Sequence, residues 1–167
     1  VEFLEADYII IANPDIHVTS RCIERVKQAL DNTEGAVMAS ARVTDPQGKD
    51  LFSYWTLLPL WKDLLDTGLI TRRLFKDMLN TPPYRLPNAG DEGSRLVDAV
   101  PGSFFMLKPG LLTPQDIEGL FDSRIFLYYE EKVLGRKFQE MGLKTVLVTD
   151  ESYVHAHSAT IDKSLKR

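Results

Sequence analysis

The first part of the chain alternates between strand-like and helix-like patterns. Residues 8–12 form an unbroken apolar run, which predicts a parallel strand covered on both faces and therefore central in a sheet. Helical spacing follows, with Thr19 or Ser20 as the capping residue. The inward positions of this helix are Ile23, Val26 and Leu30. Residues 35–43 are a second strand, and a turn follows at 45–48.

The middle of the chain has a different pattern. Apolar residues at helical spacing over 55–69 and 71–79 predict helices, and a loop rich in proline and glycine follows at 82–93. We therefore expect a helical insert with a loop over residues 51–95. The apolar side chains in this insert exceed what its own core needs; they are Trp55, Leu57, Leu58, Leu60, Trp61, Leu64, Leu65, Leu69 and Phe75.

The last part returns to short strands and one helix. Residues 96–100 and 103–107 predict strands on either side of Pro101-Gly102. A helix begins at Glu130-Glu131 and ends at Gly142. Its inward positions are Leu134, Phe138 and Met141. Strands follow at 144–148 and 153–155. The whole order predicts a single α/β domain with a mixed sheet and helices on both sides.

Composition narrows the class of protein. The 167 residues are 44% hydrophobic and 26% charged, which is typical of a globular domain, and the net charge of −4 argues against nucleic acid as a partner. Cys22 is the single cysteine, so we expect no internal disulfide and assign this side chain to packing. With no apolar run of spanning length and no signal-peptide pattern, we expect a cytoplasmic protein.

Asn13-Pro14-Asp15 directly follows the first predicted strand. Open α/β sheets bind ligands at the carboxyl ends of their strands. A carboxylate beside an amide at that place can hold Mg²⁺ or Mn²⁺ that bridges a diphosphate. A turn with a solvated Asp15 explains the same residues without any ligand.

Glu130 and Glu131 stand at the start of the last predicted helix. A carboxylate there can act as the general base of a transfer to a hydroxyl. Two glutamates that favour the positive end of a helix dipole are the simpler alternative.

His155 and His157 fall on one face of the last predicted strand, where they can ligate a metal or contact phosphate. Exposed histidines on an edge strand are the alternative. Tyr128 and Tyr129 can stack on a sugar, although tyrosines before a helix also serve in the core or at its rim.

The order of these motifs resembles family 2 glycosyltransferases, especially the bacterial rhamnosyltransferase-like group. The similar segments are the strand that ends in Asn13-Pro14-Asp15, then 97–107 with Val97-Asp98 and Gly102, then 119–131, and finally Gly142, the strand 145–148 and His155. The resemblance implies a GT-A fold, similar to the Rossmann fold. It also implies inverting transfer of a sugar from a nucleotide-diphosphate donor to a glycan or lipid-linked acceptor in surface polysaccharide synthesis.

The resemblance also implies roles for individual residues. Asp15 matches the metal-binding aspartate, with Asn13 and His155 beside the metal and the diphosphate. Glu131 matches the general base, although the family's Glu-Asp is Glu-Glu here, so Glu130 is the alternative base. The expected substrate-binding residues are Gly102, Asp98 and Tyr129. Gly102 would let the acceptor or donor approach because it has no side chain.

Two departures from the family pattern lead to further expectations. Val133 stands where the family often has a second aspartate, and nothing before Val1 supplies the family's nucleotide-binding half. We therefore expect residues 1–167 to be a partial catalytic domain, truncated at its N-terminus. One side of strand 8–12 would then be exposed or covered by another copy of the chain. The apolar insert would either contact a lipid-linked acceptor or the inner membrane face, or pack on the sheet.

Two other classes of protein compete with this interpretation. A non-catalytic glycan-binding or scaffold module can keep the fold, but it has no need for both Asp15 and Glu131. A nucleotidyltransferase also places carboxylates at strand ends, but it usually carries an early glycine-rich basic loop, which this sequence lacks.

Overall fold

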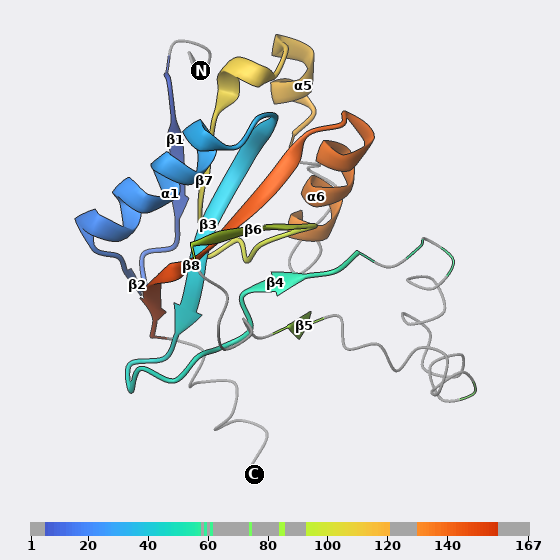
Figure 1. The fold of residues 1–167 in the computed structure, drawn as a ribbon. Coiled ribbons are helices and arrows are strands. Elements are labelled where there is room, and N and C mark those ends of the chain that lie inside the picture. The colour runs from blue at the N-terminus through green and yellow to red at the C-terminus, as the bar shows by residue number, and fades with distance from the viewer. Residues whose placement is uncertain are drawn as a thin grey trace.

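The computed structural model describes residues 6–57, 93–120 and 130–156, with positions 59, 61 and 74 and the pair 84–85. These residues form a six-stranded mixed sheet flanked by helices, and a separate two-stranded sheet (Figure 1). The elements in chain order are β1 (Ile9–Ala12), β2 (Ile16–His17), α1 (Ser20–Asn32), β3 (Ala36–Thr44), β4 (Tyr54–Trp55), β5 (Tyr84–Arg85), β6 (Ser94–Val97), β7 (Phe104–Leu107), the 3₁₀ helix η2 (Pro109–Leu111), α5 (Pro114–Glu118), α6 (Glu130–Glu140) and β8 (Lys144–His155). The predicted α/β class with a mixed sheet is therefore confirmed.

The order of the strands brings several ends to one edge of the sheet. The order is β1-β7-β3-β8-β2, and β6 also pairs with β8. β7 is antiparallel to both β1 and β3, whereas β3 and β8 are parallel. Consequently β1, β3 and β8 all end at the edge where β7 begins (Figure 1). We call this the carboxyl edge.

Helix α1 forms as the sequence predicts. The Thr19 hydroxyl caps it by accepting a hydrogen bond of 3.1 Å from the Cys22 backbone N–H. Its inward face packs one core cluster against the sheet, and Cys22, Val26 and Leu30 are buried there. The buried Cys22 confirms its assignment to packing.

A second core cluster lies on the other face of the sheet. Leu134 and Phe138 of α6 belong to it, and alternate residues of β7 divide between the two clusters because strand side chains point to opposite faces. Phe104 faces the α1 side and Phe105 the α6 side. Gly142 ends α6 with a positive φ of 72°, as predicted.

The prediction of a central first strand is wrong for the described residues. β1 pairs with β7 alone and lies at one end of the sheet order. Ile9 and Ile11 pack against the α6-side cluster, whereas Ile10 is 45% exposed. The apolar run therefore packs mainly on the α6 side, although Tyr8 contacts the α1-side cluster. The expectation that one side of this strand is exposed or covered by another copy of the chain stays a prediction.

Three further expectations need correction. Trp55 lies in strand β4 and not in a helix, since its N–H bonds to the Ala99 carbonyl. Met141 is exposed, because it lies past the last residue of α6. The two predicted strands at 144–148 and 153–155 are one strand, β8, with an irregularity inside it.

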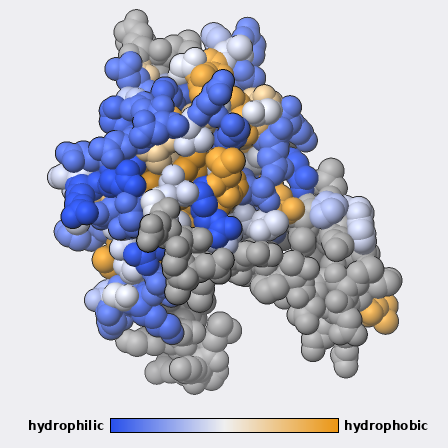
Figure 2. All heavy atoms as spheres, in the orientation of Figure 1, coloured by the Kyte–Doolittle hydropathy of each residue, from blue (hydrophilic) through white to orange (hydrophobic). Residues whose placement is uncertain are grey.

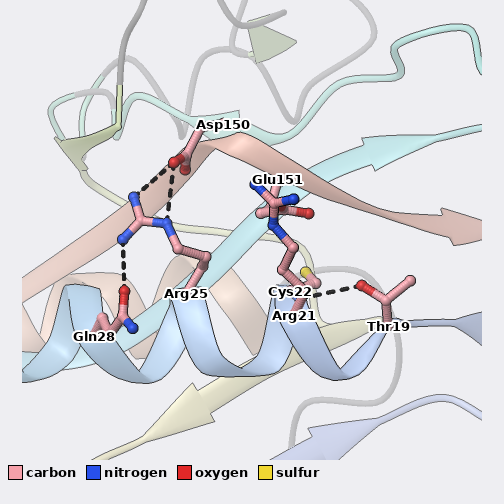
Figure 3. Close-up of polar contacts among 7 residues, drawn as sticks. All are labelled: Thr19, Arg21, Cys22, Arg25, Gln28, Asp150 and Glu151. Atoms are coloured by element: carbon pink, nitrogen blue, oxygen red, sulfur yellow. Dashed lines mark hydrogen bonds and ion pairs between the residues drawn. The ribbon is translucent and has the colours of Figure 1, made fainter.

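The irregularity in β8 is a bulge. Val148 lies opposite Ala41 of β3, and Ser152 lies opposite the next residue, Arg42. Residues 149–151 of β8 therefore have no paired residue on β3. Side chains of α1 face this bulge (Figure 3): Arg21 pairs with Glu151 at 2.7 Å, and Arg25 pairs with Asp150 at 2.7 Å. Beyond the bulge, β8 continues to the carboxyl edge.

Most of the predicted insert lies outside the described residues, including Leu58, Leu60, Leu64, Leu65, Leu69 and Phe75. Of the remainder, Trp55 is buried, whereas Trp61 is 53% exposed. Figure 2 shows hydrophilic residues over the outer face of α1. Beside this helix, hydrophobic residues lie over the part of the sheet where β6 meets β8. Leu96 of β6 is 56% exposed. Within the described part of the chain, no helix is both long and apolar enough to span a membrane.

Candidate functional site

The pairing of β1 with β7 places the Asn13-Asp15 motif beside the glycine turn before β7. Ala12 lies opposite Phe104 in the register, and one step further the Asn13 N–H donates to the Ser103 carbonyl at 2.9 Å. This hydrogen bond continues the antiparallel pairing of β1 and β7, and it brings together residues that are 90 positions apart in sequence. The motif and the turn therefore share the carboxyl edge.

Gly102 and Glu131 are in direct contact. The Gly102 N–H donates to Glu131 Oε1 at 3.0 Å. A Cβ at position 102 would lie 2.7 Å from that oxygen and 3.3 Å from the Glu131 Cδ. The missing side chain at position 102 therefore makes room for the carboxylate of Glu131. The expected approach of a substrate at this glycine stays a prediction.

Asp15 and His155 form a second pair at the same edge. His155 Nε2 lies 3.2 Å from Asp15 Oδ2, and the two side chains are 22% and 25% exposed. The backbones support this pair, because the Ala156 N–H donates to the Asp15 carbonyl at 3.2 Å and Ile16 lies opposite His155 in the β2–β8 ladder. The partly exposed pair is accessible to a ligand from solvent.

A buried hydroxyl pair lies beneath these contacts. The hydroxyls of Tyr153 and Ser103 are 2.7 Å apart, whereas the Ser40 hydroxyl donates to the Phe104 carbonyl at 2.7 Å. Burial raises the pKa of Tyr153 above its usual range, and its hydrogen bond to Ser103 offsets part of that effect. The Tyr153 hydroxyl therefore stays protonated and available as a donor.

The sequence motifs do not point to Tyr153 or Ser103. A signal was present, because Ser103 follows Gly102 directly and Tyr153 stands two positions before His155. Their contact depends on the β8 bulge, which no periodicity in the sequence reveals.

The chemistry of Asp15 and His155 fits a cation that arrives with a diphosphate. Among the described residues there is no group of three or more histidine, cysteine, aspartate or glutamate side chains that could hold a metal ion. A closed protein cage is therefore not present in that part of the chain. Mg²⁺ and Mn²⁺ often take only one or two carboxylates from the protein, with phosphate oxygens and water completing the shell. Asp15 can supply such an oxygen.

Asp98 is placed differently from the other predicted residues. Its Oδ2 accepts from the Leu57 N–H and its Oδ1 accepts from Gln139 Nε2, both at 2.8 Å. These bonds join the segment after β4 to α6. Nearby, a Cβ at Gly135 would lie 2.3 Å from the Asp98 carbonyl oxygen, so α6 packs tightly on this turn. The expected role of Asp98 in substrate binding stays a prediction.

Glu130 is half-buried at the first position of α6. Both glutamates stand in the first turn, where the helix dipole favours negative charge. Only Glu131 has a hydrogen bond to the turn before β7 among the contacts of the described residues. Tyr128, Tyr129 and His157 lie outside the described residues.

Comparison of the chain with models of known protein families, with characterised proteins and with solved structures finds no match. The function is therefore argued from the arrangement of these side chains.

Proposed function

We propose that this protein is an inverting glycosyltransferase of the GT-A type, similar to family 2 enzymes. It would transfer a sugar from a nucleotide-diphosphate donor to a glycan or lipid-linked acceptor in bacterial surface polysaccharide synthesis. The observation that carries the proposal is the 3.0 Å bond from Gly102 N–H to Glu131 Oε1, since it holds one carboxylate at the edge where Asp15 also lies. The order of the motifs along the chain supports it independently.

Glu131 would act as the general base. Its Oε1 is held by the Gly102 N–H, so the other oxygen, Oε2, would be the one that meets the acceptor. The acceptor hydroxyl donates to Oε2, and its proton passes to Glu131 as the new bond to the sugar carbon forms. The bond from that carbon to the diphosphate breaks at the same time, and the nucleoside diphosphate leaves with the electron pair. Attack from the face opposite to the leaving group inverts the sugar carbon.

Asp15 and His155 would serve the leaving group. A Mg²⁺ or Mn²⁺ held there would supply positive charge for the departing diphosphate. Asp15 would hold such a cation through Oδ1 or Oδ2, and its contact with His155 orients the carboxylate. Since the diphosphate is charged before and after transfer, this pair contributes to donor binding as well as to turnover.

The test separates loss of turnover from loss of donor binding in the full-length gene product. A panel of UDP-, GDP- and dTDP-sugars with Mn²⁺ is screened for release of the nucleoside diphosphate in the presence of glycan and lipid-linked acceptors. Glu131→Gln should lower turnover about 10²–10⁴-fold with little change in donor affinity. Asp15→Ala should remove Mn²⁺-dependent donor binding, which calorimetry measures. Glu140→Gln, at the exposed end of the same helix, is the matched control and should behave as the unmodified protein.

The other outcomes identify the alternatives. If Glu130→Gln stops transfer and Glu131→Gln does not, the base is Glu130. If a glycan binds, and Glu130→Gln, Glu131→Gln and Asp15→Ala change neither that binding nor any turnover, the domain is a non-catalytic module.

A further inference from the structure

The hydroxyl pair of Tyr153 and Ser103 is almost completely withdrawn from water. Tyr153 is 1% exposed and Ser103 is 7% exposed, and their oxygens are 2.7 Å apart. Leaving either hydroxyl unpaired at this depth costs about 1–3 kcal/mol, so the bond is strongly favoured in the folded state. The pair therefore fixes the position of Ser103 relative to β8.

Ser103 lies between the Asn13-Asp15 motif and the Gly102–Glu131 contact of the candidate site. Its carbonyl accepts the Asn13 N–H at 2.9 Å, at the start of the Asn13-Asp15 motif. Its preceding neighbour, Gly102, donates the N–H that holds Glu131. A displacement of Ser103 would therefore move the donor of the bond that orients the carboxylate.

Tyr153 is itself held from several sides. Its ring meets Phe104 edge to face, with centroids 5.1 Å apart and an interplanar angle of 62°. Its carbonyl accepts a hydrogen bond of 3.2 Å from the Thr44 hydroxyl. The ring and the backbone of Tyr153 thus have contacts of their own besides the bond to Ser103, and these contacts hold the hydroxyl in place.

We propose that Tyr153 is a positioning residue, whose hydroxyl fixes Ser103 and thereby the Gly102 N–H that sets the orientation of the Glu131 carboxylate. The inference rests on the proposed function, in which Glu131 is the base. It extends that function, because it assigns a role to a buried side chain that contacts no substrate. Tyr153 also stands two residues before His155 on β8, so the same strand end carries the partner of Asp15.

The kinetic test uses Tyr153→Phe in the full-length gene product, with Tyr54→Phe as the matched control. Tyr54 is a buried tyrosine in the α6-side core cluster. We expect Tyr153→Phe to lower kcat about 10–100-fold with the KM for the nucleotide-sugar donor unchanged, since misplacing a reacting group acts on the chemical step. Ser103→Ala should give the same loss, and the double variant should lose no more than either single one. Normal kcat in both single variants would overturn the proposal.

A second test needs no enzyme activity. In ¹⁵N-labelled protein, the Gly102 amide proton should shift as acid protonates Glu131, because a neutral carboxyl accepts a weaker hydrogen bond than a carboxylate. Glu131→Gln should remove that shift, which identifies its source. Tyr153→Phe should reduce it, whereas Tyr54→Phe should leave it unchanged. A simple loss of stability would not alter the titration of one amide in protein that is still folded.

The two tests separate the positioning role from the function. An unchanged Gly102 titration in Tyr153→Phe overturns the positioning role, whatever the activity. If that titration is reduced while the unmodified protein transfers no sugar from any donor, the positioning contact is supported and the glycosyltransferase function is the part that fails.

Discussion

The backbone N–H of Gly102 and the carboxylate of Glu131 meet at 3.0 Å, although the two residues belong to different elements. Gly102 precedes β7 and Glu131 lies in the first turn of α6. Charge-assisted bonds of this kind are among the stronger hydrogen bonds in proteins. The contact therefore fixes α6 against the sheet as well as orienting the carboxylate.

Replacing Gly102 by alanine should displace Glu131. The new Cβ would lie 2.7 Å from Oε1, a distance at which one of the two groups must move. We expect transfer to fall about 10–100-fold, because a small misplacement of the reacting group slows the chemical step. Gly110→Ala is the control, since a Cβ at that position meets nothing within 4 Å. Equal activity of the two variants would mean that the exact placement of Glu131 does not matter.

Replacing His155 by alanine should weaken metal-dependent donor binding. His155 orients Asp15 through the 3.2 Å contact, and loss of such a supporting group typically reduces metal affinity about 10–100-fold. Calorimetry with Mn²⁺ and a series of nucleoside diphosphates measures the change. His17→Ala provides the comparison, because His17 is exposed on β2. An unaltered Mn²⁺ dependence in His155→Ala would exclude this role.

Alkaline pH should destabilise the fold. Burial raises the pKa of Cys22 from 9.0 to about 12, and it also raises the pKa of Tyr153. Between pH 9 and 12 the unfolded chain loses the Cys22 proton while the folded chain keeps it. The free energy of unfolding should therefore fall with rising pH, by up to about 1.4 kcal/mol per pH unit for this thiol.

Urea unfolding of the unmodified chain and of Cys22→Ala, measured from pH 8 to 11, tests this expectation. The variant should show a shallower decline because the Cys22 contribution is absent. Parallel declines would show that Cys22 ionises as readily in the folded state as in the unfolded state.

Truncating Phe138 should be far more damaging than truncating Met141. Phe138 is 1% exposed in the α6-side core, whereas Met141 is 41% exposed just past the end of the same helix. Phe138→Ala should cost about 3–5 kcal/mol through lost burial and a cavity. Met141→Ala should cost no more than about 0.5 kcal/mol. Chemical denaturation measures both, and similar costs would mean that α6 is rotated from its described orientation.

The sequence predicted those elements whose signals are local. Thr19 and the apolar spacing after it define α1, and Gly142 ends α6 because a positive φ suits glycine. The position of β1 in the sheet was not predictable, since Ile9 and Ile11 give the same apolar run whether one face is covered or both. The strand Tyr54–Trp55 was also missed, because two residues cannot show a period.

The candidate site was predictable in part. Motifs in the sequence indicate Asp15, Glu131, Gly102 and His155, and the structure places these residues in two pairs at one edge. What the sequence could not supply was the pairing itself, which depends on strand register and on the β8 bulge. The buried Tyr153 belongs to this second kind of information.

The bulge divides β8 into two segments that pair with β3 in different registers. The pairing with β3 up to Val148 fixes the first segment, and the ladder resumes after the three extra residues with Val43 opposite Tyr153. Both of these side chains belong to the α1-side core cluster, so the resumed register sets the face of Tyr153 and, two residues further on, of His155. The far end of β8 can therefore be offset along β3 to meet the site without any change in the ladder that precedes the bulge.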